Sequence, residues 1–236
     1  MKLYTNGCSF TYGDELDNPS TSCWPALIAK DLELELVNDA MSGGTNDRTV
    51  YRTIKNLQSN FDIYVIAWTS YYRFTVYDHF NSDINFNPSL LNSKYKDNAF
   101  FKNWGEIYYQ HWFNELYAFK KWLQQIIQLQ HVLSAHNYIM VNTMENNLLK
   151  WLSPKETFIQ NTKKLICFDQ MTDTQILDEY KEIQYYNTII DKTKFVGWGT
   201  FTLAGIPASF ARGESGHILE DGHRHVAEIL KNHIDV

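Results

Sequence analysis

A serine in a glycine-bounded turn near the N-terminus is the first residue of this sequence that could do chemistry. The run Gly7-Cys8-Ser9-Phe10-Thr11-Tyr12-Gly13 comes at the end of a predicted strand over residues 2–8. A serine at such a turn, with glycine two positions before it, exposes its hydroxyl and leaves its backbone N–H free to donate to an oxyanion. The alternative is a tight turn closed by a local serine hydrogen bond. On these residues alone, both interpretations stand.

A histidine near the C-terminus could act as the base for this serine. The run Glu214-Ser215-Gly216-His217 lies just before a predicted C-terminal helix. An imidazole removes a proton efficiently when a carboxylate orients it, and Glu214 stands three residues before His217. A second register makes Glu220 and His223 the carboxylate–histidine pair. A solvated loop histidine without a catalytic role is the ordinary alternative.

These two segments together resemble the sequence blocks of the SGNH (GDSL-like) hydrolase superfamily. The first block there is Gly-Asp-Ser-x-Thr-x-Gly, and residues 7–13 match it with Cys8 in place of the Asp, a variant that resembles a branch often found in phage and bacterial genomes. The last block is Asp-x-x-His, often followed by Gly-His. Placing that Gly-His on Gly222-His223 puts the catalytic position on His217. The resemblance thus implies Ser9 as nucleophile, His217 as base and Glu214 as its carboxylate.

The oxyanion hole that the resemblance implies is only partly represented. Members of the superfamily use the N–H of the nucleophile, here Ser9, a glycine N–H after the second strand, and an asparagine after the third. Gly43 or Gly44 supplies the glycine, since a residue without Cβ lets the backbone approach the oxyanion closely. The Gly-x-Asn-Asp block is missing, and Ser70 occupies the approximate asparagine position. Asn46, beside the glycine loop, is the candidate third donor.

Three residues at or just after the end of the third predicted strand are candidates for substrate binding: Trp68, Ser70 and Arg73. Trp68 and Arg73 have two equal interpretations. In one they are a core aromatic and a loop cation. In the other they form a binding wall in which Arg73 meets an anionic or polar group.

The order of apolar runs predicts the fold that would bring these residues together. Strand and helix alternate five times, which indicates a three-layer α/β/α fold with a five-stranded parallel sheet. The resemblance to the SGNH hydrolases implies that this fold is of the flavodoxin-like kind. The nearly continuous apolar run at residues 62–68 is typical of a parallel strand buried on both faces. In such sheets the reactive loops lie beyond the carboxyl ends of the strands. The predicted strands cover residues 2–8, 34–38, 62–68, 138–142 and 194–198.

We expect a single domain over residues 1–236 that carries an aromatic-rich insert at about 71–135. Within the insert we predict a long loop over residues 71–104, which would suit a lid, and one amphipathic helix from Trp104 to Ala135. Two further helices are predicted between residues 153 and 192, with Asp173 as the cap of the second. The last helix is predicted from Glu220 to Ile234.

Composition excludes several classes of function. The net charge is −6, without a basic run, which argues against a nucleic-acid binder. No apolar run reaches the roughly 18 residues that would span a bilayer. The chain has 3 cysteines, too few and too scattered for a disulfide framework or a zinc site, and the spacing of His217, His223 and His225 does not put three ligands on one helix face. We therefore expect no metal and no cofactor.

The resemblance implies a serine esterase that acts on small acyl esters through an acyl-enzyme on Ser9. Its substrate would be a small molecule or a glycan ester such as an O-acetyl sugar, and the aromatic insert suits stacking on sugar rings. The alternatives are a catalytically impaired phage structural or carbohydrate-binding protein with the same fold, and acyl transfer to an acceptor other than water. The N-terminus lacks the apolar stretch of a signal peptide, which predicts cytoplasmic synthesis; a phage-encoded chain would be associated with the virion. The oligomeric state is not predicted.

Overall fold

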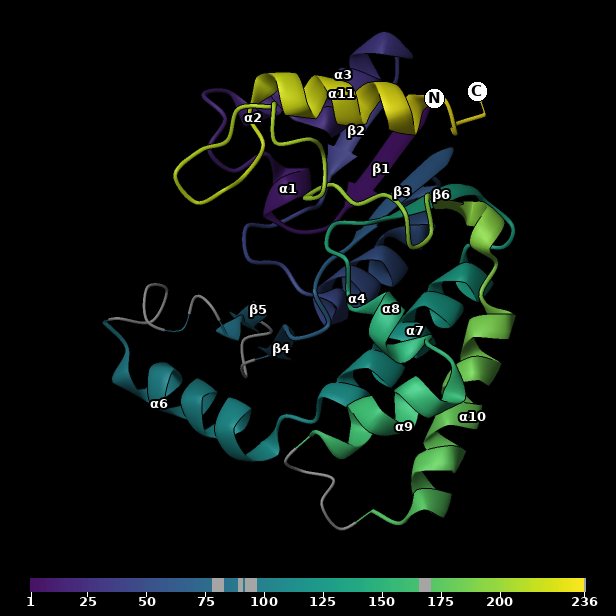
Figure 1. The fold of residues 1–236 in the computed structure, drawn as a ribbon. Helices are drawn as coiled ribbons and strands as arrows, with labels where there is room; N and C mark the ends of the chain where they lie inside the picture. The colour runs from purple at the N-terminus through teal and green to yellow at the C-terminus, as the bar shows by residue number, and fades with distance from the viewer. Residues whose placement is uncertain (78–82, 89–90, 92–96, 166–170, 236) are drawn as a thin grey trace.

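The computed structural model describes residues 1–77, 83–88, 91, 97–165 and 171–235. Its elements alternate between strand and helix along most of the chain (Figure 1). The strands are β1 (Lys2–Asn6), β2 (Glu35–Asn38), β3 (Ile63–Trp68), β4 (Phe74–Tyr77), β5 (Asp83–Phe86), β6 (Asn137–Asn142) and β7 (Phe195–Val196). The helices are α1 (Ser9–Tyr12), α2 (Pro19–Ser22), α3 (Trp24–Asp31), α4 (Asn46–Asn56), α6 (Ala99–Ile107), α7 (Glu115–Val132), α8 (Leu148–Trp151), α9 (Lys155–Lys163), α10 (Asp173–Ile189) and α11 (Glu220–Lys231).

The main sheet has the strand order β2-β1-β3-β6-β7, and all its neighbouring strands are parallel. This confirms the prediction of an α/β fold with a parallel sheet. Four strands of 4 to 6 residues form the body of the sheet, while β7 contributes only 2 residues. The order matches the doubly wound, flavodoxin-like arrangement, in which a crevice opens beyond the carboxyl ends of the central strands. The loops after β1, β2, β3 and β6 therefore meet at one edge.

The alternation of side chains along β3 explains why this strand is apolar throughout. Ile63, Val65 and Ala67 belong to a core cluster with residues of α3 and α11, whereas Tyr64 and Ile66 belong to a second cluster with residues of α7 and α10. Figure 1 shows the same two helical layers, with α3 and α11 over one face of the sheet and α4, α7 and α10 over the other. The sheet is thus buried on both faces, which fixes the positions of its strand ends.

The predicted insert differs from the structure in two ways. Residues 71–104 are not all loop, because β4 and β5 form an antiparallel pair and α6 begins at Ala99. Part of the predicted lid, at residues 78–82, 89–90 and 92–96, lies outside the described residues, as does Cys167. The single helix predicted from Trp104 to Ala135 is interrupted at Phe113. Asn114 then starts α7, because its side chain accepts a hydrogen bond from the Tyr117 N–H.

Two further helices agree closely with the sequence pattern. The predicted pair between residues 153 and 192 corresponds to α9 and α10. The cap of α10 is Thr172 rather than Asp173, and Thr172 forms a capping box with Gln175. Among the described residues, no helix is both long enough and apolar enough to cross a membrane.

A buried histidine connects α11 to the opening of α3. The imidazole of His223 is fully buried, and its Nδ1 accepts a hydrogen bond of 3.1 Å from the backbone N–H of Trp24. An imidazole nitrogen accepts a hydrogen bond only when it carries no proton. Burial, and to a smaller extent the nearby His217, lower the pKa of His223 from 6.5 to about 4. The neutral imidazole therefore connects the last helix, α11, to the start of α3.

We predict that His223 makes the fold sensitive to acid. Its pKa is lower in the folded chain than in the unfolded chain, so the unfolded chain binds more protons between pH 6.5 and about 4. The free energy of unfolding should fall as the pH decreases through this window, by up to about 3 kcal/mol. Urea unfolding at pH 7 and pH 4.5 measures this loss. In His223→Asn, whose amide oxygen can replace the Nδ1 acceptor, the loss should be much smaller, whereas the exposed His131→Asn should behave like the native protein. Equal losses in the native protein and His223→Asn would contradict the prediction.

Candidate active site

Ser9 is the first residue of the one-turn helix α1, which follows strand β1 after Gly7 and Cys8. Cys8 precedes it in an extended conformation, and the N–H groups of Thr11 and Tyr12 donate to the Cys8 carbonyl. The Ser9 N–H stands at the start of this helix, where no carbonyl of the same helix can accept from it. Gly7 is required here, because a Cβ on it would lie 2.4 Å from Thr11 Oγ1 and 3.0 Å from Ala67. The Ser9 N–H makes no hydrogen bond to the described residues. The residue itself is buried, with 5% of its surface exposed, so the turn does not expose the serine to solvent as the sequence predicted.

The glycine loop after β2 presses against this turn. A Cβ on Gly44 would lie 2.8 Å from the Gly7 carbonyl oxygen and 3.5 Å from the Cys8 Cα, so only glycine allows the approach. The Gly44 N–H donates a hydrogen bond of 2.8 Å to the Met41 carbonyl. Gly43 has a positive φ of 68° and its N–H makes no hydrogen bond to the described residues. Of the two glycines that the sequence left open, Gly43 is therefore the one with a free donor.

His217 comes to the same edge of the sheet from the C-terminal loop. Its ring packs on Phe10, the neighbour of Ser9, with the ring centroids 4.9 Å apart. Its Nδ1 lies 2.7 Å from the carboxylate of Glu15, which is 202 residues away in the sequence. Nε2 is left as the nitrogen available for a reacting proton. The described residues show no hydrogen bond between this imidazole and the Ser9 hydroxyl, so that contact stays a prediction.

The carboxylate of Glu15 is enclosed by the loop that carries His217. It accepts hydrogen bonds from the N–H groups of Ser215, at 2.8 Å, and His217, at 3.2 Å. Gly213 makes room for it, because a Cβ there would lie 2.5 Å from the Glu15 Cδ. These hydrogen bonds, chiefly the one from Ser215, lower the pKa of Glu15, so the carboxylate is charged at neutral pH. Glu15 itself has a left-handed backbone with φ of 69°, a conformation that is uncommon outside glycine and often found at functional sites.

Glu15 replaces the residue that the sequence suggested for this role. Glu214 is exposed, and the carboxylate on the Nδ1 of His217 comes from Glu15 instead. The reason is local: the loop closes on itself through a hydrogen bond from the Gly213 N–H to the His217 carbonyl, and its N–H groups enclose Glu15. The competing register with His223 as base does not fit either, since the Nδ1 of His223 is taken by the Trp24 N–H and its imidazole is fully buried.

Asn46 does not fit the role of a free oxyanion donor. Its amide nitrogen donates to the Thr69 carbonyl, at 3.0 Å, and its amide oxygen accepts from the Thr69 N–H, at 2.9 Å. This pair of hydrogen bonds ties the start of α4 to the end of β3. Ser70 is half-buried, and its hydroxyl accepts from the Tyr72 N–H at 3.3 Å. Neither side chain replaces the asparagine that the superfamily pattern calls for.

Trp68 is a core residue and not part of a binding wall. Its side chain is fully buried, and its indole N–H donates to the sulfur of Met140 on the neighbouring strand, at 3.3 Å. Arg73, in contrast, is half-buried, and its guanidinium donates to the Gly44 carbonyl at 3.2 Å. Arg73 therefore lies beside the glycine loop, as a binding residue would.

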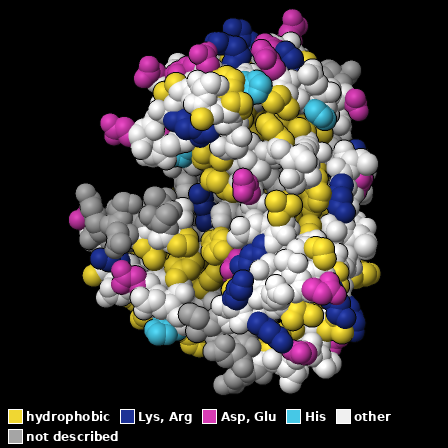
Figure 2. All heavy atoms as spheres, in the orientation of Figure 1, with side chains coloured by type: hydrophobic (Ala, Val, Ile, Leu, Met, Phe, Trp, Pro, Cys, Tyr) yellow, Lys and Arg dark blue, Asp and Glu magenta, His cyan; other side chains and the backbone are white. Residues whose placement is uncertain are grey.

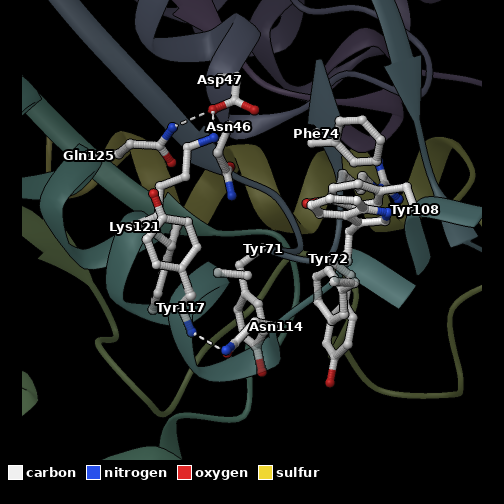
Figure 3. Close-up of a pocket in the computed structure, with 15 residues that line it drawn as sticks. Asn46, Asp47, Tyr71, Tyr72, Phe74, Tyr108, Asn114, Tyr117, Lys121 and Gln125 are labelled. Carbon is white, nitrogen blue, oxygen red and sulfur yellow. Dashed lines mark hydrogen bonds and ion pairs between the residues drawn. The ribbon is translucent and has the colours of Figure 1, made fainter. Parts of the chain in front are cut away.

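An aromatic cavity of about 240 Å³ adjoins this edge of the sheet. Figure 3 shows Phe74 and Tyr108 on one side of it and Tyr117 with Lys121 on the other. Tyr72 stacks on the ring of Phe113, with the centroids 5.2 Å apart. In Figure 2, apolar side chains gather over β4, β5 and α6, below a hollow in the surface. The aromatic content of this region is evident from the sequence, but the spacing of the aromatic residues does not show which rings line a cavity. The aromatic residues that line it are Tyr71, Tyr72, Phe74, Tyr108, Trp112, Phe113, Tyr117 and Trp122.

Within the described part of the chain, the His, Cys, Asp and Glu side chains form no group that could hold a metal ion. The chemistry that the arrangement can perform with its own groups is proton transfer by His217, attack by a serine hydroxyl and binding of an oxyanion by backbone N–H groups.

Comparisons with known proteins identify a family but no chemistry. A model described as "Family of unknown function (DUF6071)" matches residues 14–171, a range that includes Glu15 and Gly43 but neither Ser9 nor His217. No curated protein matches the chain.

Solved structures with a similar arrangement of elements include G-D-S-L proteins. One is a G-D-S-L family protein from Desulfitobacterium hafniense DCB-2, with a TM-score of 0.49, 14% identity and 99% of each chain covered. Another is TesA, with a TM-score of 0.47 and 13% identity, covering 99% of this chain and 97% of that one. A third, a member of the lipolytic protein G-D-S-L family from Veillonella parvula DSM 2008, has a TM-score of 0.46 and 11% identity, covering 98% and 97%.

We predict that Glu15, and not Glu214, holds the loop that carries His217. In Glu15→Ala the amides of Ser215 and His217 lose their acceptor, so their hydrogen exchange should become faster. Glu214→Ala removes an exposed carboxylate from the same loop and should leave both exchange rates unchanged. Exchange measured by NMR on the three proteins tests this directly. Unchanged rates in Glu15→Ala, or equal changes in both variants, would show that another contact orders the loop.

Proposed function

We propose that this chain, which belongs to the family of unknown function DUF6071, is a serine hydrolase of small acyl esters. The observation that carries the proposal is the carboxylate–imidazole pair of Glu15 and His217, packed on the residue next to Ser9. Carboxylate, imidazole and hydroxyl are the three groups of a catalytic triad, and a triad is recognised by its geometry and roles rather than by the order of its residues.

In the proposed reaction, the Nε2 of His217 takes the proton of the Ser9 hydroxyl as its oxygen attacks the ester carbonyl carbon. The N–H groups of Ser9 and Gly43 donate to the carbonyl oxygen as it becomes negatively charged. The ester bond then breaks, and the proton passes from His217 to the leaving alcohol. Water repeats the sequence on the acyl-enzyme and releases the acid. Glu15 keeps the imidazole in the tautomer with the proton on Nδ1 and stabilises its charged form.

The third oxyanion donor of the superfamily pattern has no counterpart in this proposal. Loss of one such donor typically lowers turnover by about 10²–10³. We therefore propose a hydrolase with low turnover, whose substrate is an O-acylated small molecule or sugar. The aromatic cavity supports the choice of a sugar, because flat aromatic faces stack on sugar rings.

A second candidate function has one observation in its favour. The aromatic cavity presents well-exposed rings, with Trp112 76% and Tyr117 62% exposed. A carbohydrate-binding protein that has lost the hydrolase activity would keep these rings for binding, and its Ser9 would not react with esters. Acyl transfer to an acceptor other than water would use the same residues as hydrolysis.

We predict that a fluorophosphonate probe labels the native protein at Ser9. The probe reacts with serine hydroxyls that have an activating base and an oxyanion hole. The adduct should be found by mass spectrometry on the peptide that contains Ser9 and should be missing in Ser9→Ala. Labelling should also be slower by at least about tenfold in Glu15→Gln, since a neutral amide cannot stabilise the charged imidazole.

Glu214→Gln is the matched control, because it removes a carboxylate from the same loop and should be labelled at the native rate. If native protein and Ser9→Ala both stay unlabelled while both remain folded, the carbohydrate-binding alternative is favoured over the hydrolase.

A further inference from the structure

A second cavity, of about 300 Å³, lies beyond the ends of β3 and β6. These strands are neighbours in the sheet, and two hydrogen bonds connect the segments at their ends. The Thr143 N–H donates to the Trp68 carbonyl, and the Asn146 side-chain amide donates to the Thr69 carbonyl. Its volume is at the lower end of the range for small-molecule sites, which fits a ligand about the size of a single sugar. We call it the polar cavity, after its lining residues Ser70, Tyr72, Arg73, Asn87, Met144, Asn146 and Asn147.

Arg73 is the charged residue of this lining, and its surroundings differ from those of cations such as Arg48 and Lys150. Arg48 is paired with Asp83, at 2.7 Å, and Lys150 is paired with Glu115, at 2.8 Å. Within the described ranges, no carboxylate lies within 4.0 Å of the Arg73 guanidinium, whose hydrogen bond goes to the neutral Gly44 carbonyl. A guanidinium carries five N–H donors, so most of those on Arg73 remain for a ligand.

The contact with Gly44 places this cation beside the proposed nucleophile. Gly44 packs against Gly7 and Cys8, the two residues before Ser9. Arg73 donates to the carbonyl of the same glycine, at 3.2 Å. A group held by Arg73 therefore lies next to the site where an ester carbonyl would react, and one small molecule can reach both.

We propose that the polar cavity binds a carboxylate on the substrate, so that the protein acts on O-acyl esters of acidic sugars or similar hydroxy acids. This inference rests on the proposed function. A single guanidinium matches the charge of one carboxylate and can bind it through two parallel hydrogen bonds. A phosphate dianion needs more positive charge than this lining offers. The amide and hydroxyl groups around Arg73 suit the hydroxyls of a sugar.

The binding test uses free acids, so that it does not depend on the activity of Ser9. NMR titrations with glucuronate, glucose and glucose 6-phosphate compare the native protein with Arg73→Gln. We expect glucuronate to bind the native protein at least about tenfold more tightly than glucose, and Arg73→Gln to abolish this preference. Arg224→Gln, which removes an exposed cation of α11, should bind as the native protein does. Equal affinity for glucuronate and glucose, no effect of Arg73→Gln, or tighter binding of glucose 6-phosphate would overturn the inference.

A kinetic test separates binding of a carboxylate from another role for Arg73. The kcat/KM for O-acetyl glucuronate relative to O-acetyl glucose should fall at least about tenfold in Arg73→Gln, mainly through KM. An equal loss on both esters would mean that Arg73 acts on the oxyanion, and the inference would be overturned. If glucuronate binds through Arg73 but the fluorophosphonate does not label Ser9, the carboxylate site stands and the hydrolase proposal fails.

Discussion

The carboxylate of Glu15 is the group on which the arrangement of this site depends. It comes from a loop after the first strand and binds two N–H groups and the imidazole of a loop that precedes the last helix. These hydrogen bonds join segments that are 200 to 202 residues apart in the sequence. Because the same carboxylate both folds the loop and orients His217, the structural and the proposed catalytic role cannot be separated in this protein. The left-handed backbone of Glu15 is a strain that the surrounding hydrogen bonds must offset.

On the N-terminal side of the site, close packing of the backbone holds the groups in position. On the C-terminal side, the hydrogen bonds of Glu15 have this role. Gly44 rests on the turn that holds Ser9, and its carbonyl accepts from Arg73. Arg73 of the polar cavity is thereby held beside the glycine loop through a hydrogen bond from its guanidinium, and this loop is held against the turn of Ser9 by close packing of the backbone. A buried parallel sheet beneath them holds the ends of the strands in place. Catalysis by groups that are positioned in advance requires such rigid support.

The sequence predicts the parts of this structure that follow from periodicity and fails where contacts are long-range. The buried strand at residues 62–68 was predictable, because a strand covered on both faces must be apolar throughout. Glu15 was not, since it lies in a polar loop and its partners are far away in the sequence. The sequence could not show whether Trp68 lies in the core or in the cleft. An aromatic residue at the end of a strand can point in either direction. The start of α7 after its N-cap Asn114 could not be predicted from the spacing of apolar residues, because that spacing continues without interruption from α6 into α7. The capping residue is the local sign that a new helix begins here.

A crystal structure of the protein after reaction with a fluorophosphonate would show whether Ser9 is the nucleophile, because the bound phosphonyl group marks the positions of the reacting atoms. We expect a covalent bond from the Ser9 oxygen to phosphorus, with the phosphonyl oxygen within about 3 Å of the N–H groups of Ser9 and Gly43. The Nε2 of His217 should lie within hydrogen-bond reach of the Ser9 oxygen, and Glu15 should remain on Nδ1. An adduct on another residue, or a phosphonyl oxygen directed away from these N–H groups, would contradict it.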